Sequence, residues 1–482
     1  MKVSLSKRKT ITLLLVGGVL FLFIGIYAWL VYAGYVQLGA KGIIGKGSRG
    51  AALSKGATAP SKTWYFAEGC TRDNPEFDTF LCLQNPQDKQ VTVNVTFALA
   101  EGQGNNVTKS YTLPKKSRFT INVNDAVGQE KDVAMTVSST EPIVAERAMY
   151  FVYNGKYGST SSVGSPILSQ RWYFPEGCTG SGFDEWILIY NPQNKDTDVQ
   201  VQFRNQDGAV VKEQKMKVKA GRRLSLKANA LAPDQWQIWT YVYSNLPVVA
   251  ERAMYVATGD KSGGSNSLGR TNREADTSWY FGENYVTSSG SFQEYILVID
   301  PQCNEGNKQV TLYGYSGGKQ IGSAKYTLPQ CGRLTIPVQA IDAFKDKTDL
   351  AIVVSADKKI IAERAIYAKH NFGGGVFVWD VTSETGIPGA QLSKTWYLPE
   401  GFTTSAQNNL SFLEYLILFN PTKNKTDVSV SFMKNNSQAE VKKFSIPAHT
   451  RLPVQVNGIL LGEHSMAISS TQPITAERVI FQ

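Results

Sequence analysis

Acidic residues are missing from the first part of the chain. No Asp or Glu occurs before Glu68, whereas nine Lys or Arg residues occur up to Lys62. The chain has 50 Lys and Arg and 40 Asp and Glu residues, so removing these nine cations leaves 41 basic residues against 40 acidic ones. A nucleic-acid-binding protein carries its basic excess on the binding domain. Here the excess flanks a hydrophobic segment, and we expect no nucleic-acid partner.

Histidine and closely spaced cysteine are also scarce. Three histidines in 482 residues are too few to give every part of the chain a zinc site or a histidine-based catalytic centre. The five cysteines show no Cys-x-x-Cys spacing, which disfavours a zinc ribbon. We therefore expect neither a metal nor another cofactor.

One long hydrophobic run stands near the beginning of the chain. From Ile11 to Ala40 no residue is charged, and the run exceeds the roughly 20 apolar residues that cross a bilayer as a helix. Trp29, Tyr32 and Tyr35 cluster at its C-terminal end, and aromatic side chains favour the membrane interface. A cleaved signal peptide has a shorter apolar core and a small-x-small cleavage site. The length of this run therefore favours an uncleaved signal-anchor.

The N-terminal region accordingly divides into three predicted segments. They are a cytoplasmic tail over residues 1–10, a transmembrane signal-anchor helix over 11–35 and a flexible basic linker over 36–62. Gly, Ala, Ser and Lys dominate the linker, which is typical of a flexible tether. The short tail places the N-terminus inside. We expect a single-pass protein of the cell membrane whose C-terminal repeats are extracytoplasmic.

Four landmarks recur in the same order four times. Each copy opens with a Trp-Tyr strand that leads to a Glu, and then reaches an Asn-Pro or Asp-Pro turn. A single Arg before a later strand follows, and each copy closes with Ala-Glu-Arg. The opening tryptophans are 108, 107 and 117 residues apart, at Trp64, Trp172, Trp279 and Trp396.

This spacing indicates separate domains. Propeller blades and solenoid coils repeat every roughly 20–50 residues, whereas a stretch of about 107 residues is long enough to bury its own core. We expect four domains in a row, at residues 63–164, 165–269, 270–389 and 390–482. The Gly- and Ser-rich stretches expected to join them are Tyr157 to Gly164, Gly259 to Gly269 and Phe372 to Gly389.

Within a copy, apolar residues recur at every second position. Val91, Val93, Val95 and Phe97 alternate with polar residues, which predicts a half-buried strand. Seven such strands are expected in the first copy, near 63–68, 79–84, 91–99, 108–113, 118–124, 132–139 and 143–153. Seven short strands per hundred residues are typical of a two-sheet sandwich. The predicted fold class is all-β, with four tandem seven-stranded Ig-like β-sandwich domains after one N-terminal transmembrane helix.

These landmarks resemble a repeat of bacterial surface proteins, especially of actinobacteria and other Gram-positive lineages. That repeat has the pattern Trp-Tyr-Phe-x-Glu-Gly, then Asn-Pro, then a Ser-Arg-type loop, then Pro-Ile-Val-Ala-Glu-Arg-x-Met-Tyr-Phe. Copy 1 matches it best, over Pro142 to Phe151, whereas copy 3 has Asn284 for the Gly and Lys359 for the Pro. The family is a domain of unknown function. The resemblance covers residues 63–482 and implies exported β-domains.

The recurrent Glu and Arg residues are the sharpest chemical feature. In the closing strand of copy 1, Glu146 and Arg147 both lie among apolar neighbours, and buried charges must be paired. We expect Arg147 to meet the opening Glu68, and Glu146 to meet Arg118 or a backbone turn. The full set of structural ion-pair candidates is Glu68, Arg118, Glu146, Arg147, Glu176, Arg223, Glu251, Arg252, Glu283, Arg333, Glu363, Arg364, Glu400, Arg451, Glu477 and Arg478.

An enzyme of the glycoside hydrolase type would use two of these carboxylates as acid and nucleophile. The pairs that could do so are Glu176 with Glu185, Glu283 with Glu294, and Glu400 with Glu414. Copy 1 has Thr79 at the second place, and four complete active sites in series would be unusual. We expect a non-enzymatic protein without catalytic residues.

Cysteine positions allow one disulfide prediction. Cys303 follows the Asp-Pro turn and Cys331 follows the second arm of the next hairpin, so both lie at the same end of the predicted sheet. A disulfide between them is expected, with two free thiols as the alternative. Cys70 and Cys82 could pair in the same way, which would leave Cys178 unpaired.

Two functions follow from this organisation. The first is a membrane-anchored extracytoplasmic structural or adhesive cell-surface protein, which allows self-association. The alternative is a glycan- or cell-wall-polymer-binding protein that uses the loops varying most between copies. Those loops are residues 70–77, 178–183, 284–291 and 402–411.

Overall fold

The computed structural model describes residues 51–259, 261–287, 291–371, 377–405, 412–435 and 438–481. Strands dominate these ranges, which confirms the all-β class. The chain divides into Met1–Gly47 and a compact unit Ser48–Gln482. The predicted tail, the predicted anchor at 11–35 and the linker up to residue 50 lie outside the described residues. Across the described part, no helix combines the length and the apolar content that a membrane crossing needs.

Each copy contributes the same series of strands. In copy 1 they are β2 (Ser61–Phe66), β3 (Phe77–Asn85), β4 (Val91–Leu99), β5 (Val107–Leu113), β6 (Ser117–Asn122), β7 (Val133–Tyr153) and β8 (Lys156–Val163), with the short helix α2 (Val123–Val127) after β6. In copy 2 they are β9 (Ser169–Phe174), β10 (Phe183–Asn191), β11 (Thr197–Asn205), β12 (Val210–Val218), β13 (Arg222–Lys227), β14 (Ile238–Thr258) and β15 (Lys261–Leu268), with α3 (Ala228–Leu231).

Copies 3 and 4 follow the same plan. Copy 3 has β16 (Asp276–Asn284), β17 (Phe292–Ile299), β18 (Lys308–Ser316), β19 (Lys319–Leu328), β20 (Arg333–Pro337), β21 (Leu350–Asn371), β22 (Phe377–Thr385) and the short β23 (Ile387–Pro388). Copy 4 has β24 (Ser393–Leu398), β26 (Leu413–Phe419), β27 (Thr426–Met433), β28 (Gln438–Ile446), β29 (Arg451–Gln455) and β31 (Ser465–Phe481). A two-stranded ladder of β25 (Phe402–Thr403) and β30 (Gly462–Glu463) accompanies copy 4.

One long strand organises each copy. The first half of β7 pairs with β2 and β4, and its second half pairs with β3 and β8. The two strands expected near 132–139 and 143–153 are therefore a single strand. Pro142, which has no N–H to donate, lies where β7 passes from one ladder to the other. Each copy is thus one curled antiparallel sheet whose two ladders share the long strand, and the seven-stranded Ig-like sandwich stays a prediction.

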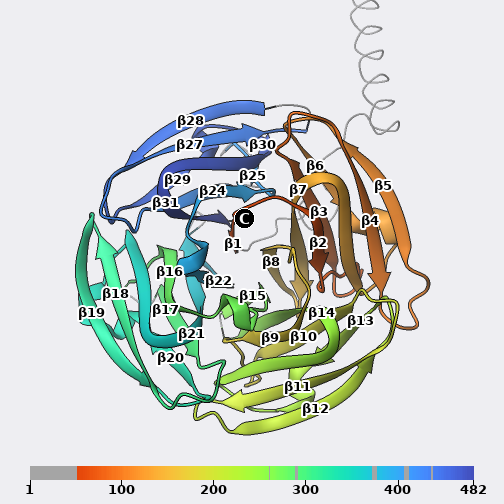
Figure 1. Ribbon diagram of the computed structural model, residues 1–482, viewed down its shortest axis with the longest axis horizontal. Helices are drawn as coiled ribbons and strands as arrows, with labels where there is room; N and C mark the ends of the chain where they lie inside the picture. Colours follow the sequence, from red (N-terminus) through yellow and green to blue (C-terminus); the bar gives the residue numbers. More distant parts are fainter. Residues whose placement is uncertain are drawn as a thin grey trace, which may run out of the picture. The chain divides into compact units, whose positions relative to one another are not determined.

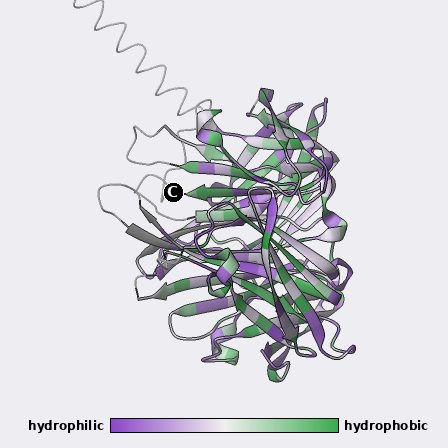
Figure 2. Cartoon of the chain, turned by 90° about the vertical axis from the view of Figure 1, so that its left-hand side faces the viewer, coloured by the Kyte–Doolittle hydropathy of each residue, from purple (hydrophilic) through white to green (hydrophobic). Residues whose placement is uncertain are grey.

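The alternating pattern places one face of each strand in the core. In β4 the apolar residues from Val91 to Phe97 are buried, while Thr92 and Asn94 are exposed. Hydrophobic and hydrophilic segments accordingly alternate along the strands (Figure 2). Each opening tryptophan is buried, and its indole N–H donates to a carbonyl of the long strand, as Trp64 does to Ile143 at 2.9 Å.

The four copies of the unit Ser48–Gln482 form a closed ring (Figure 1). Strands β5, β12, β19 and β28 lie on its outer rim. Strands β1 (Ala51–Lys55), β8, β15 and β22 lie at its centre, where each contacts the next in cyclic order. Copy 4 also meets copy 1 through Arg478 and Glu146. The four copies are therefore arranged in a closed ring, and the expected linear row is wrong.

The stretches expected to be linkers hold the central strands. Tyr157 to Gly164 largely coincides with β8, and Gly259 to Gly269 contains β15. Their glycines serve close packing, because a Cβ on Gly158 would stand 2.4 Å from the Phe151 ring. Composition alone suggested flexibility, but small side chains also let strands approach closely.

The linker expected over residues 36–62 is likewise a strand, and not a flexible tether, near its C-terminal end. Strand β1 lies within it and pairs with β31 of copy 4, from Ala51 opposite Phe481 to Lys55 opposite Glu477. It fills in copy 4 the place that β8, β15 and β22 fill in the other copies. Copy 4 is therefore completed by a strand from the beginning of the chain.

Neighbouring copies also share apolar surface. One hydrophobic cluster combines Phe77 and Phe151 of copy 1 with Tyr255 of copy 2, and the ring centroids of Phe151 and Tyr255 are 5.1 Å apart. Trp239 of copy 2 belongs to the cluster of copy 3. The boundaries of four independent domains therefore stay a prediction.

Candidate functional site

The recurrent Glu and Arg residues meet between copies. We call the contacts of these residues at the four interfaces the ring interface network. The closing Arg of one copy forms an ion pair with the closing Glu of the next copy, and each of these eight residues is at most 2% exposed. The pairs are Arg147–Glu251 at 2.6 Å, Arg252–Glu363 at 3.0 Å, Arg364–Glu477 at 3.0 Å and Arg478–Glu146 at 3.0 Å.

The interface of copies 2 and 3 shows how many hydrogen bonds these charges form. Arg252 donates to both carboxylate oxygens of Glu363, at 3.0 and 3.1 Å, and to Ser383 Oγ at 2.8 Å. It also donates to the Glu176 carbonyl of its own copy at 2.9 Å. Glu363 in turn accepts from Ser267 Oγ at 2.5 Å and from the Glu176 N–H at 3.0 Å. The network therefore joins the opening strand of one copy to the closing strand of the next.

A second pair links the opening Glu of one copy to the lone Arg of the next. The nitrogen-to-oxygen distances are 3.8 Å for Arg223–Glu68 and 3.4 Å for Arg333–Glu176, and Arg451 pairs closely with Glu283. The fourth interface differs, because Arg118 pairs with Glu463, and Glu400 pairs with Arg478 at 2.5 Å. Sequence reasoning missed Glu463, which belongs to none of the repeated landmarks.

The expected pairing within one copy is corrected at two points. Arg147 does contact Glu68 of its own copy, but through the Glu68 carbonyl at 3.2 Å. The Glu68 side chain faces Arg223 of copy 2. Glu146 meets a backbone N–H, as one alternative allowed, but the donor is Glu400 of copy 4 at 3.0 Å. Because every copy carries the same landmarks, the pattern cannot tell a partner within a copy from one in the next.

Glu176 and Glu363, the two carboxylates at the interface of copies 2 and 3, differ in their proton affinity. Burial raises the pKa of Glu176, and the charges of Arg333 and Arg252 oppose this only in part. For Glu363 burial acts in the same direction, but Arg252 and the hydrogen bonds from Ser267 and the backbone lower its pKa overall. The closing pair is therefore an ion pair buried in a protein interior.

The second glutamates of the hydrolase hypothesis hold the loop after the opening strand. Glu185 accepts from the Cys178 N–H at 2.8 Å, and Glu414 accepts from the Phe402 N–H at 3.0 Å. Thr79 of copy 1 does the same for Cys70 at 3.0 Å. Burial raises the pKa of Glu185 and that of Glu294 to about 8. A threonine can replace this group because its task is to bond a loop.

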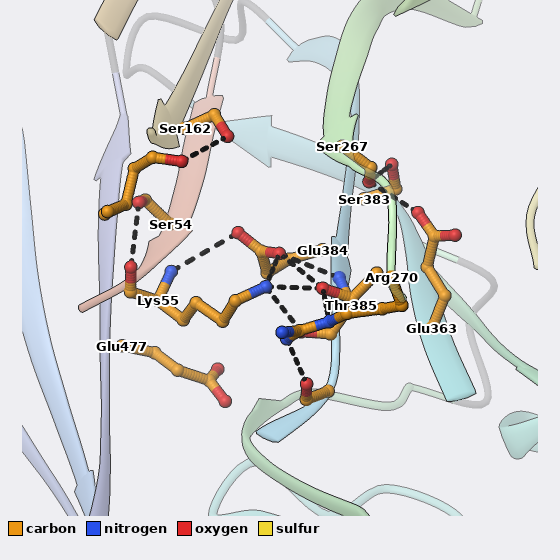
Figure 3. Close-up of polar contacts among 12 residues, drawn as sticks. Ser54, Lys55, Ser162, Ser267, Arg270, Glu363, Ser383, Glu384, Thr385 and Glu477 are labelled. Atoms are coloured by element: carbon orange, nitrogen blue, oxygen red, sulfur yellow. Dashed lines mark hydrogen bonds and ion pairs between the residues drawn. The ribbon is translucent and has the colours of Figure 1, made fainter. Parts of the chain in front are cut away.

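Strand β1 is fixed at the centre by a cluster of charges (Figure 3). Lys55 pairs with Glu384 of copy 3 at 2.6 Å and donates to the hydroxyl of Thr385. Arg270 donates to the same hydroxyl at 3.0 Å and pairs with Glu274 at 2.7 Å. The strand that completes copy 4 is therefore also bonded to copy 3.

The cysteines fall into two groups. Cys303 and Cys331 are joined by a disulfide. Cys70, Cys82 and Cys178 are buried free thiols, and burial raises the pKa of each to about 12. Within the described ranges, no group of three His, Cys, Asp or Glu side chains is placed to hold a metal ion.

Two hollows lie between copies 2 and 3. One of about 470 Å³ borders the variable loop 178–183, and Trp236 on its wall is 60% exposed. The other, of about 400 Å³, lies between strands β9, β11 and β14 of copy 2 and the turn after β17 of copy 3. Sequence reasoning singled out the first loop but not the second hollow: Tyr173 and Pro301 on its wall belong to the repeated landmarks, whereas Arg204, Trp239 and Tyr241 belong to none.

Comparison with known proteins leaves the family open. No protein-family model and no curated protein matches the chain. Among solved structures, Thermotoga maritima 1070 is 15% identical, with a TM-score of 0.20, over 22% of this chain and 94% of its own. The Anabaena sensory rhodopsin transducer is 21% identical, with a TM-score of 0.16, over 18% of this chain and 96% of its own. A tetra-tandem repeat from the extending region of a large adhesion protein is 11% identical, with a TM-score of 0.09, over 89% and 98%. At these values the likenesses assign no function to this chain.

Proposed function

We propose that this protein is a non-enzymatic, membrane-anchored, extracytoplasmic structural or adhesive protein of the cell surface. Its four β-rich copies would form a rigid ring on a single-pass anchor. The observation that carries the proposal is the use of the recurrent Glu and Arg residues as contacts between copies. The constant part of the repeat thus serves the architecture, which leaves the parts that differ between copies for recognition.

The geometry also argues against hydrolysis by the recurrent carboxylates. A retaining or inverting glycosidase needs two carboxyl groups that flank the same bond of a bound sugar. Glu176 lies against Arg333, and Glu185 bonds the Cys178 N–H with its side chain fully buried. Glu176 is therefore held by an ion pair, and Glu185 by a backbone hydrogen bond to one of its two oxygens.

The location and the role can be tested in cells of the source organism. Protease added to intact cells should digest a tag placed after Gln482 but not one placed before Lys2. Deletion of the gene should reduce attachment to surfaces or to other cells, and the wild-type gene should restore it. A protease-resistant C-terminal tag, or unchanged attachment and envelope morphology, would contradict the proposal.

The alternative is binding of a glycan or wall polymer through the variable loops. The hollow beside loop 178–183 favours it, because an exposed tryptophan next to polar side chains suits a sugar ring. A glycan array with the full-length protein in detergent would show a ligand whose signal falls when Trp236 is replaced by Ala. Equal signals for both proteins would remove this alternative.

A further inference from the structure

Three side chains of the second hollow between copies 2 and 3, those of Arg171, Arg204 and Trp239, stand where the other copies carry different residues. Arg171 precedes the opening tryptophan, where the other copies have Thr63, Ser278 and Thr395. Arg204 of β11 pairs in register with Trp239, and the corresponding ladder pairs are Ala98–Ala134, Tyr315–Ala351 and Met433–Ser465. We call this hollow the Arg204 groove.

The arginines of the groove form no ion pair among the described residues, and its described lining contains no Asp or Glu. The carboxylate that acts on Arg204 from outside the groove is that of Glu213, which accepts a hydrogen bond from the Gln202 amide at 2.9 Å. Asp300 lies behind the turn but is itself paired with the buried Lys308 at 3.2 Å. Arg204 is half-buried, and this burial lowers its pKa. A guanidinium without an ion-pair partner in a partly desolvated hollow attracts an anion, and its planar fork matches a carboxylate.

Aromatic rings and amides complete the wall. The rings of Tyr173 and Tyr241 stand 5.0 Å apart, and Arg204 is held over the Trp239 ring, 5.6 Å from its centroid. Arg204 is also fixed by bonds to Gly208 O and Gln202 Oε1, both at 2.9 Å. On the copy 3 side, the Oε1 atom of Gln302 is buried and has no hydrogen-bond partner among the described residues. Amides of this kind can donate to and accept from hydroxyl groups.

The volume of about 400 Å³ lies in the range of small-molecule sites. A site that combines a cation, a flat apolar ring and amide groups fits a sugar that carries an acid group. A simple inorganic anion would not use the rings, and a neutral sugar would not use the charges.

We propose that the Arg204 groove binds a uronic acid unit of an acidic polysaccharide. The sugar carboxylate lies against Arg204 and Arg171, its ring lies over Tyr241, and Gln302 bonds its hydroxyls. This inference deepens the adhesive role and rests on the proposed function for the presence of such a polymer outside the cell. The groove itself is independent of the loops named in the alternative.

The test uses the full-length protein in mild detergent and isothermal titration with two probes. Tetragalacturonate carries the acid group, and its methyl ester is the same sugar without charge. The acid should bind at least tenfold more tightly than the ester. Arg204→Gln and Arg171→Gln should each weaken binding of the acid at least tenfold, with unchanged melting. Lys217→Gln, a charge change on the exposed strand β12, should leave binding unchanged.

A third variant separates a sugar site from a simple anion site. Tyr241→Thr, the residue that copy 1 has at this place, should weaken both probes. No binding of the acid, equal binding of acid and ester, or wild-type affinity in the Arg204 variant would overturn the proposal. Competition by sulfate as strong as that by the sugar acid, with no effect of Tyr241→Thr, would overturn the assignment to a sugar. None of these outcomes bears on the location or the adhesive role, which the cell experiments test separately.

Discussion

Removal of the Arg252 charge should destabilise the ring across an interface. The Arg252→Met change keeps the apolar stem but removes four hydrogen bonds, two of them to Glu363. Glu363 would then be a fully buried carboxylate without its cation. Loss of one partner of a buried pair costs about 3–5 kcal/mol. That is a large part of the roughly 5–15 kcal/mol by which proteins are stable.

A double-mutant cycle measures the pair itself. Urea unfolding of the full-length protein in detergent, followed by tryptophan fluorescence, should show a loss of about 3–5 kcal/mol for Arg252→Met and a similar loss for Glu363→Gln. The double variant should lose less than the sum of the two by about 2–3 kcal/mol, because it leaves neither Arg252 nor Glu363 as a lone buried charge. Lys217→Met, which breaks the exposed pair with Asp198, is the control and should cost less than about 1 kcal/mol.

The place of the damage separates the ring from independent domains. Hydrogen exchange should become faster at the backbone around Glu176 in copy 2 and around Ser383 in copy 3, since both bond Arg252. If each copy were autonomous, as the sequence led us to expect, copy 2 alone would loosen. Strict additivity of the two variants, or exchange confined to copy 2, would refute the inter-copy network.

Three further predictions follow from the buried groups. The pKa of Glu185 is about 8 in the fold and near 4.5 in the unfolded chain, so its contribution to the free energy of unfolding falls as pH rises from about 4.5 to 8. Glu185→Gln should therefore stabilise the protein more at pH 8 than at pH 5 in urea titrations. A stabilisation that does not change with pH would count against this. Leu53→Ala should lower the free energy of unfolding by about 2–5 kcal/mol and speed hydrogen exchange in β31, because Leu53 packs on Ile417 and Val479. The control Lys62→Ala, at an exposed residue, should have no effect. A Leu53 variant as stable as the wild type would mean that β1 is a tether after all. Replacing Cys303 and Cys331 by Ser should lower the free energy of unfolding by about 3–4 kcal/mol under oxidising conditions, as the chain-entropy model gives for cysteines 28 residues apart. An unchanged urea midpoint would show that the disulfide does not form.

Local patterns in the sequence predicted local structure well. The alternation from Val91 to Phe97 predicted β4 with its bounds nearly as observed, because the side-chain period of a strand can be read from neighbours in the chain. The Ala-Glu-Arg landmark likewise showed that charges lie in an apolar strand and need partners. What it could not show was the identity of the partner, since four identical landmarks permit pairing within a copy or between copies.

The central strands were missed for a different reason. Gly and Ser between Tyr157 and Gly164 have low strand propensity, and a tether has the same composition. Their place is decided by the neighbouring copies, which pack against them, and no window of the sequence contains that contact. The Arg204 groove was missed similarly, because Arg171, Arg204 and Tyr241 are far apart in the chain and are absent from the repeated pattern.

The closure of copy 4 by β1 also limits how such a chain could change in evolution. A linear array of repeats tolerates the gain or loss of a unit, because each unit contacts only its neighbours. In this chain, deletion of one copy would remove the ring geometry that brings Glu146 and Arg478 into contact. Duplication of a copy would separate the same two residues. The repeat number is therefore expected to be inherited as a fixed quantity, while substitutions accumulate in the surfaces between the constant landmarks.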